Sequence, residues 1–259
     1  MSFATNYVKE WNRIISNWFQ NKDSISSLLY GKLSIDHIPE PFYGNMEECS
    51  IVIINLNPGV GLPEQCWSNQ NQQGLFVTDV KNINSYSNYV KDFPLLPDEQ
   101  KGYPKGPQPA IDWWKQRRLK WINRILCNMG IKTDKKPFAI ELCPLHSKKF
   151  EIDASQYHHN LKTANPKLDV MEAMIFAIKA SDAKIGLAIG KPIYKVLTDE
   201  GFEDITQVTD IKPINGNCRE YHIVEKDGVR VLCTWARGGN LAPREEFGEY
   251  EKRILKKYK

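Results

Sequence analysis

The chain has no hydrophobic run long enough to cross a membrane. No apolar stretch approaches the roughly 20 residues that a membrane-spanning helix needs, and the start, MSFATNYVKEWN, lacks the basic-then-apolar pattern of a signal peptide. Internal repeats and low-complexity segments are also missing. Hydrophobic residues at 41% and charged residues at 25% of the 259 positions are ordinary globular values. We therefore expect a globular cytoplasmic protein with no membrane partner, and exclude the disordered and fibrous classes.

Metal-binding patterns are missing as well. The six cysteines, at 49, 66, 127, 143, 218 and 233, include no C-x-x-C pair, and the five histidines show no metal-ligand spacing. We expect buried free thiols, no bound metal and no organic cofactor.

A candidate nucleic-acid surface follows the helix predicted from Pro109 to Met129. The net charge is only +4, which permits a nucleic-acid partner without requiring one. Trp113, Arg117, Trp121 and Arg124 lie along one face of this helix, and aromatic and basic groups together favour nucleic acid. The alternative is that these side chains cover the scaffold.

Short apolar runs alternate with helical patterns. Strands are predicted within IVII (51–54), PFAIELCP (137–144), AKIGLAIG (183–190) and GVRVLCTW (228–235), and helices within residues 1–20, before Gly130, after Asp169, after Pro192 and at the C-terminus. This alternation predicts a single α/β domain, residues 1–259, with a mainly parallel sheet of about four strands flanked by helices and an N-terminal helical extension over about 1–48.

Ligands of such sheets bind at the carboxyl ends of the strands. The strand-end loops are NLNPG, ELCPLHS, GKP and ARGGNLAP. Asn55 and Asn57 lie in a tight turn, where they either contact a ligand or satisfy the turn's own backbone. Lys191 at a helix N-terminus can hold a phosphate. Leu241 is a candidate wedge between bases, or it packs into the core.

The order of these motifs resembles the uracil-DNA glycosylase superfamily, nearest its mismatch-specific branch. The matching segments are IVIINLNPG, GLFV (74–77), FAIEL (138–142), KIGLAIGKPIYKVL (184–197) and VLCTWARGGNLAP (231–243), which span about residues 50–245. The resemblance implies that the protein flips a base out of duplex DNA, hydrolyses its N-glycosidic bond and leaves an abasic site.

The resemblance also implies roles for individual residues. Asn57 would position the attacking water, Phe76 would stack on the flipped base, and Asn55 and Glu141 would contact that base. Arg237 stands near the position where many members carry a histidine, and we expect it to supply the positive charge that stabilises the departing base. The DNA contacts implied are Pro58, Gly59, Lys148, Lys191, Gly238, Gly239, Asn240 and the wedge Leu241.

Glu141 falls where uracil-specific members carry an asparagine. An ionised carboxylate only accepts hydrogen bonds, so it would suit the amino group of cytosine and repel the O4 of uracil. The sequence therefore suggests a cytosine-type base, for which the glucosylated hydroxymethylcytosine of phage DNA, excised by some anti-phage members, is a candidate. A carboxylate paired with a nearby lysine is the structural alternative.

Two other functions stay open. One is a catalytically inactive DNA-binding or sensing protein with the same fold, which the missing motif histidine favours. The other is a hydrolase or transferase of small nucleotides, although no Ser-His-Asp elbow or dinucleotide fingerprint supports it. The oligomeric state is also open, with a monomer favoured.

Overall fold

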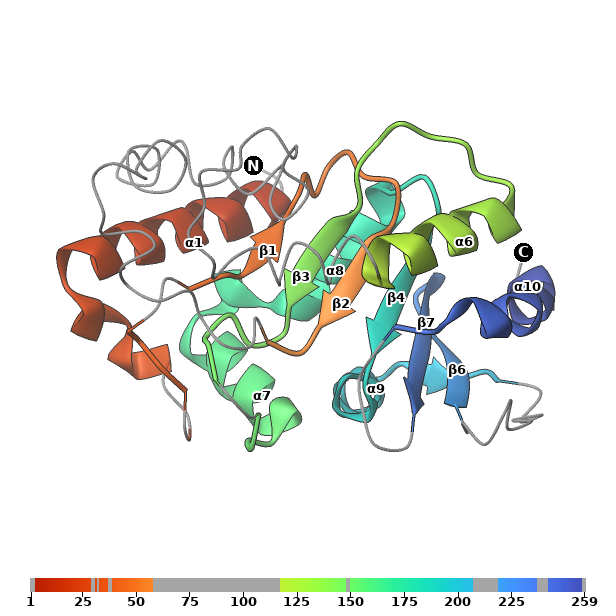
Figure 1. Ribbon diagram of the computed structural model, residues 1–259. Helices are drawn as coiled ribbons and strands as arrows, with labels where there is room; N and C mark the ends of the chain where they lie inside the picture. The colour runs from red at the N-terminus through yellow and green to blue at the C-terminus, as the bar shows by residue number, and fades with distance from the viewer. Residues whose placement is uncertain are drawn as a thin grey trace.

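The computed structural model describes residues 3–28, 31, 33–36, 39–57, 117–147, 150–206, 219–236 and 242–257. Within them, seven strands form one mixed sheet in the spatial order β1-β3-β2-β4-β7-β6-β5 (Figure 1). The strands are β1 Phe42–Tyr43, β2 Val52–Asn55, β3 Phe138–Glu141, β4 Ile185–Ile189, β5 Glu203–Asp204, β6 Arg219–Lys226 and β7 Val229–Ala236. The described chain is thus an α/β protein built on this sheet.

The four predicted strands form the centre of the sheet. β3, β2, β4 and β7 are neighbours, and each pairs with the next in parallel. Every residue of β2, β3 and β4 is buried, as continuous apolar runs require when both faces of a sheet are covered. The prediction of a mainly parallel centre made of these four segments is confirmed.

Three further strands extend the sheet at its edges, so the expected total of about four is too low. β1 pairs with β3, and β6 with β7, in antiparallel fashion, while β5 pairs with β6. β1 and β5 have two residues each, which is too few for a periodic pattern. β6 mixes charged and buried residues, so it lacks the apolar run by which the central strands are found.

Helices cover both faces of the sheet. They are α1 Phe3–Gln20, α6 Leu119–Met129, α7 Ala154–Ala164, α8 Val170–Ala180, α9 Lys191–Asp199 and α10 Gly248–Lys257, with 3-10 helices η1 Lys22–Leu28, η4 Pro166–Leu168 and η5 Glu245–Phe247. In Figure 1, α6 and α10 lie in front of the sheet and α8 lies behind it. Gly186 of β4 faces α8, because a Cβ added there would come within 2.7 Å of Ile178 Cδ1. This glycine therefore permits the close approach of α8 to the sheet.

Signals in the sequence mark the ends of two helices as expected. Asp169 begins α8, and its Oδ1 accepts hydrogen bonds from the backbone N–H groups of Met171 at 2.9 Å and Glu172 at 3.2 Å. Gly130 follows α6 in the left-handed conformation, with φ 72°. Both helix boundaries therefore follow from local chemistry.

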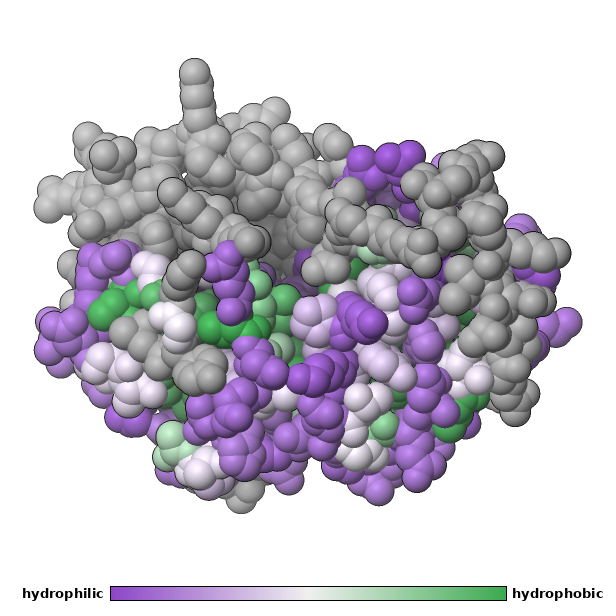
Figure 2. Space-filling view, turned by 90° about the horizontal axis from the view of Figure 1, so that it is seen from below, coloured by the Kyte–Doolittle hydropathy of each residue, from purple (hydrophilic) through white to green (hydrophobic). Residues whose placement is uncertain are grey.

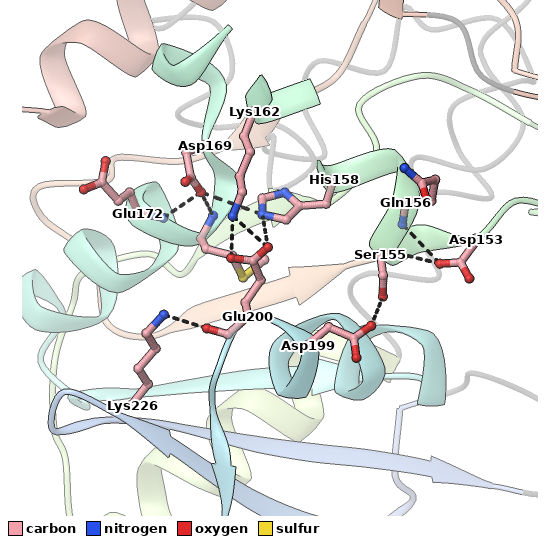
Figure 3. A network of polar contacts seen from close by, with 11 residues as sticks. Asp153, Ser155, Gln156, His158, Lys162, Asp169, Glu172, Asp199, Glu200 and Lys226 are labelled. Carbon is pink, nitrogen blue, oxygen red and sulfur yellow. Dashed lines mark hydrogen bonds and ion pairs between the residues drawn. The ribbon is translucent and has the colours of Figure 1, made fainter. Parts of the chain in front are cut away.

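A polar network ties α7, α8 and α9 to β6 (Figure 3). The buried His158 has its Nε2 3.5 Å from Glu200 Oε1 and 3.8 Å from Asp169 Oδ1. Lys162 Nζ lies 2.6 Å from Glu200 Oε2, and Lys226 Nζ donates to the backbone oxygen of Glu200 at 2.6 Å. Glu200 caps the C-terminal end of α9. The network therefore fixes this end of α9, whereas the other end of the helix follows directly after β4.

Cys49, Cys143 and Cys233 are free and buried, as expected, whereas Cys127 is free but exposed.

Candidate functional site

The last residues of two neighbouring central strands are polar and buried. Asn55 ends β2 and Glu141 ends β3, and the two residues pair directly across the parallel strands. Each is only 3% exposed, and Asn55 Nδ2 donates a hydrogen bond to Glu141 Oε1 at 2.6 Å. Every other residue of β2 and β3 is apolar. Polar side chains therefore enter the core at this edge of the sheet.

Arg118 joins this pair from the start of α6. It is the residue before the first of α6, and its guanidinium donates a hydrogen bond to Asn55 Oδ1. The Asn55 amide is thus oriented by one partner for its oxygen and another for its nitrogen. In Figure 1, α6 crosses the front of the sheet and begins beside the end of β2. We call Arg118, Asn55 and Glu141 the strand-end cluster.

Burial dominates the electrostatics of this cluster. It raises the pKa of Glu141 to about 8, although the charge of Arg118 and the hydrogen bond from Asn55 both lower it and the charge of Glu40 raises it. Burial therefore favours the protonated carboxyl over the carboxylate at this position. This modifies the interpretation from sequence, which treated Glu141 as ionised.

One oxygen of Glu141 is unused. Its Oε1 accepts from Asn55, whereas its Oε2 is buried and has no hydrogen-bond partner among the described residues. An unsatisfied buried carboxyl oxygen costs about 1–3 kcal/mol. A bound water molecule or ligand is one way in which such an atom is satisfied.

A second carboxyl group lies beside the cluster. Glu40 precedes β1, and it accepts a hydrogen bond from the Tyr43 hydroxyl. Its Oε1 lies 3.7 Å from His146 Nε2. The backbone holds this segment against β3, because the N–H of Glu141 donates to the oxygen of Pro41 at 3.0 Å. The polar region thus extends from β2 across β3 to β1.

Asn57 lies two residues beyond β2 and pairs with a serine. Its Nδ2 donates to Ser147 Oγ at 3.1 Å. The chain after β2 runs beside the chain after β3, since the backbone N–H of Leu142 donates to the backbone oxygen of Asn55, and the backbone N–H of Cys143 donates to the backbone oxygen of Leu56. Among the described residues, Asn57 Oδ1 has no hydrogen-bond partner.

The structure brings together three of the residues singled out from sequence, namely Asn55, Asn57 and Glu141. Lys191 is exposed at the start of α9, and no described contact joins it to the strand-end cluster. Figure 2 views the side of the molecule on which β2, β3 and β4 end, and hydrophilic side chains cover most of the described surface there. The remaining candidates lie outside the described residues: Pro58, Gly59, Phe76, Lys148, Arg237, Gly238, Gly239, Asn240 and Leu241.

Sequence reasoning missed Arg118, Glu40, Tyr43 and the pairing role of Ser147. His146 and Ser147 belong to ELCPLHS, a loop that the strand-end rule already marks for attention. Arg118 carried no comparable signal, because its contact to Asn55 crosses 63 positions of sequence.

The aromatic and basic face of α6 is internal where the structure describes it. Trp121 is fully buried and its Nε1 donates to Glu251 Oε1 at 2.9 Å. Arg124 Nε donates to Glu251 Oε2 at 2.7 Å, and Tyr221 OH donates to Glu251 Oε1 at 3.0 Å. These side chains bind α6 to α10 and β6, so for Trp121 and Arg124 the structure supports the alternative given above, that they cover the scaffold, and not the DNA surface. Trp113 lies outside the described residues.

Within the part of the chain that the structure describes, no three histidine, cysteine, aspartate or glutamate side chains are placed to hold a metal ion. No described helix has the length and apolar character needed to cross a membrane. Comparisons of the chain with protein-family models, with curated proteins and with solved structures found no match.

Proposed function

We propose that the protein is a DNA glycosylase that hydrolyses the N-glycosidic bond of a flipped-out base and leaves an abasic site. The observation that carries this proposal is the buried Asn55–Glu141 pair at adjacent strand ends, which has an unused carboxyl oxygen and lies two residues from Asn57. The order of sequence motifs that resemble the uracil-DNA glycosylase superfamily gives the pair this interpretation. DNA, in duplex form, is the proposed partner.

The candidate substrate is a cytosine-type base, with the glucosylated hydroxymethylcytosine of phage DNA as the modified form to test. A flipped base is read through hydrogen bonds to its Watson–Crick edge. Glu141 Oε2 would face that edge, because Oε1 is already held by Asn55. Either form of the carboxyl finds a partner on cytosine: the ionised form accepts from the amino group, and the acid form donates to the ring nitrogen N3.

The hydrolysis proceeds through loosening of the bond between the base and the sugar. Asn57 would hold the attacking water through Oδ1, since its Nδ2 is fixed by Ser147. Arg118, held in the strand-end cluster by its hydrogen bond to Asn55, would stabilise the negative charge that develops on the departing base, a role that the sequence analysis gives to Arg237. Stacking by Phe76 and wedging by Leu241 are roles that the resemblance implies.

The test is excision from a panel of labelled duplexes that contain uracil, mismatched thymine, hydroxymethylcytosine or glucosylated hydroxymethylcytosine. Abasic products are detected by alkaline cleavage. Asn57→Ala is the active-site variant, and Asn160→Ala, at an exposed position of α7, is its matched control. We expect cleavage of one cytosine-type substrate that is lost in Asn57→Ala and kept in Asn160→Ala.

Two outcomes would contradict the proposal. Tight, salt-dependent binding of DNA with no cleavage of any substrate would favour the inactive DNA-binding protein. Turnover of free nucleotides without affinity for DNA would favour a small-molecule enzyme. If Glu141→Gln left the preference among bases unchanged, Glu141 would not be the residue that reads the base.

A further inference from the structure

The two carboxyl oxygens of Glu141 differ in their partners among the described residues. Its side chain is buried, its Oε1 is held by Asn55 Nδ2 at 2.6 Å, and its Oε2 has no hydrogen-bond partner among the described residues. An amide N–H can only donate, so Asn55 bonds the carbonyl-type oxygen and leaves the hydroxyl of the acid form on Oε2. The proton of the acid form is thus on the oxygen that no described protein group uses.

Burial favours the protonated form of this carboxyl against the charge of Arg118. Arg118, before α6, interacts with Glu141 through its charge. The other titratable side chains that interact electrostatically with Glu141 or Arg118 are Glu40 before β1, Tyr43 of β1, Tyr7 of α1 and Cys143 after β3. Burial outweighs the opposing charge of Arg118 and raises the pKa of Glu141 to about 8. A general acid works best when its pKa lies near the operating pH.

We propose that Glu141 is the general acid of the reaction, donating its Oε2 proton to the ring nitrogen N3 of a cytosine-type base as that base departs. This inference rests on the proposed glycosylase function. The bond between C1′ and the base nitrogen N1 breaks, and its electron pair goes to the base. The Glu141 proton bonds N3, so the base leaves neutral. Water oxygen bonds C1′ and the water loses one proton to solvent. Glu141 takes up one proton from solvent, which restores its acid form and balances the protons.

The acid form also selects the base. N3 of cytosine carries a lone pair and accepts a hydrogen bond, whereas N3 of uracil and thymine carries a hydrogen and donates one. The Oε2 hydroxyl can therefore donate a hydrogen bond to N3 of cytosine. In uracil or thymine the N3–H group would face this hydroxyl, and two hydrogen-bond donors would repel each other. Once the proton has moved, Arg118 lies beside a carboxylate and stabilises it.

The experiment compares single-turnover excision of the active cytosine-type base with that of its 3-deaza analogue, in which carbon replaces N3. Wild type, Glu141→Gln and Glu172→Gln are measured on both substrates. The amide of Glu141→Gln retains an oxygen for Asn55 but transfers no proton, whereas Glu172 is an exposed carboxylate of α8. We expect Glu141→Gln to slow excision about 10²- to 10⁴-fold, the range of general acid catalysis, and Glu172→Gln to leave the rate unchanged.

The rate losses caused by Glu141→Gln and by the 3-deaza substrate should not multiply. We expect the 3-deaza substrate to slow the wild type by a similar factor and to slow Glu141→Gln no further, because both changes remove the same proton transfer. The wild-type rate should also fall above about pH 8, with no such limb in Glu141→Gln.

Independent, multiplying losses would overturn the general-acid role while leaving the glycosylase function intact. No excision of any base by the wild type would overturn both. If Glu141→Gln failed to fold, the wild type alone would decide: equal rates on cytosine and its 3-deaza analogue would refute proton transfer to N3.

Discussion

Replacing Glu141 by glutamine should change how the stability of the protein depends on pH. Burial raises the pKa of Glu141 from an ordinary value of 4.5 to about 8 in the folded protein. Between these two values the folded protein keeps the proton, while the unfolded chain has already released it. Unfolding then releases a proton, so the free energy of unfolding falls as the pH rises. The contribution is complete below about pH 4.5 and is lost as the pH passes 8.

The size of this effect follows from the width of the pH window. Each pH unit inside it is worth about 1.4 kcal/mol. From pH 5 to 8 the wild type should therefore lose about 4 kcal/mol relative to Glu141→Gln, whose amide does not titrate. The glutamine oxygen can still accept from Asn55 Nδ2, so the hydrogen bond at 2.6 Å in the wild type has a counterpart in the variant.

Urea unfolding of both proteins at half-unit steps from pH 5 to 8.5 measures this difference. Subtracting the two curves removes the titration of groups that behave alike in both. Parallel curves would show that Glu141 is ionised throughout, which would refute the acid form on which the selection of cytosine N3 depends. If Arg118 overcame burial, the folded pKa of Glu141 would lie below 4.5, and the two curves would likewise be parallel over this pH range, because neither state would then bind the proton.

Two further predictions concern the scaffold. Burial lowers the pKa of His158, so the unfolded chain takes up a proton more readily, and acidification below about pH 6.5 should destabilise the wild type. Urea unfolding should show that the free energy of unfolding falls less steeply with acidification in His158→Gln than in the wild type, and equally steeply in His159→Gln, an exposed control on the same helix. Equal dependence on pH in both variants would contradict this prediction. Arg124→Met should cost about 3–5 kcal/mol in the same assay because it removes the cation that forms an ion pair with the fully buried Glu251. Lys195→Met, at an exposed ion pair, should cost at most about 1 kcal/mol, and similar costs would refute the distinction between the two pairs.

The centre of the fold could be predicted from sequence because its signals are local. A short, continuous apolar run such as Ile51–Ile54 is typical of a strand that is covered on both faces of its sheet. Asp169 carries its own capping chemistry, and Gly130 tolerates the left-handed conformation that ends α6. The edge strands gave no such signal, since two-residue β1 depends on its pairing with β3 and not on its own composition.

The candidate site could be predicted only in part, for the same reason. The sequence singled out Asn55 and Asn57 in the turn predicted after a buried strand, although Asn55 is the last residue of β2, and it singled out Glu141 through the family resemblance. Their relation was not visible: the Asn55–Glu141 hydrogen bond spans 86 positions of sequence, and the protonated state of Glu141 depends on burial by the whole fold. Sequence identifies the residue type, but the tertiary environment decides whether a carboxyl accepts or donates.

The placement of polar groups argues that the strand-end cluster serves a ligand and not the core. β2 and β3 are otherwise entirely apolar, and their last residues alone are polar. An apolar pair would fill the same two cross-strand positions without the desolvation cost that buried polar groups carry. Glu251 shows what a structural buried carboxylate needs in this protein, since Trp121, Arg124 and Tyr221 all donate to it. Glu141 Oε2 has no such donor among the described residues, so the chain tolerates here a deficit that it avoids at Glu251, and a ligand offering the missing hydrogen bond would remove it.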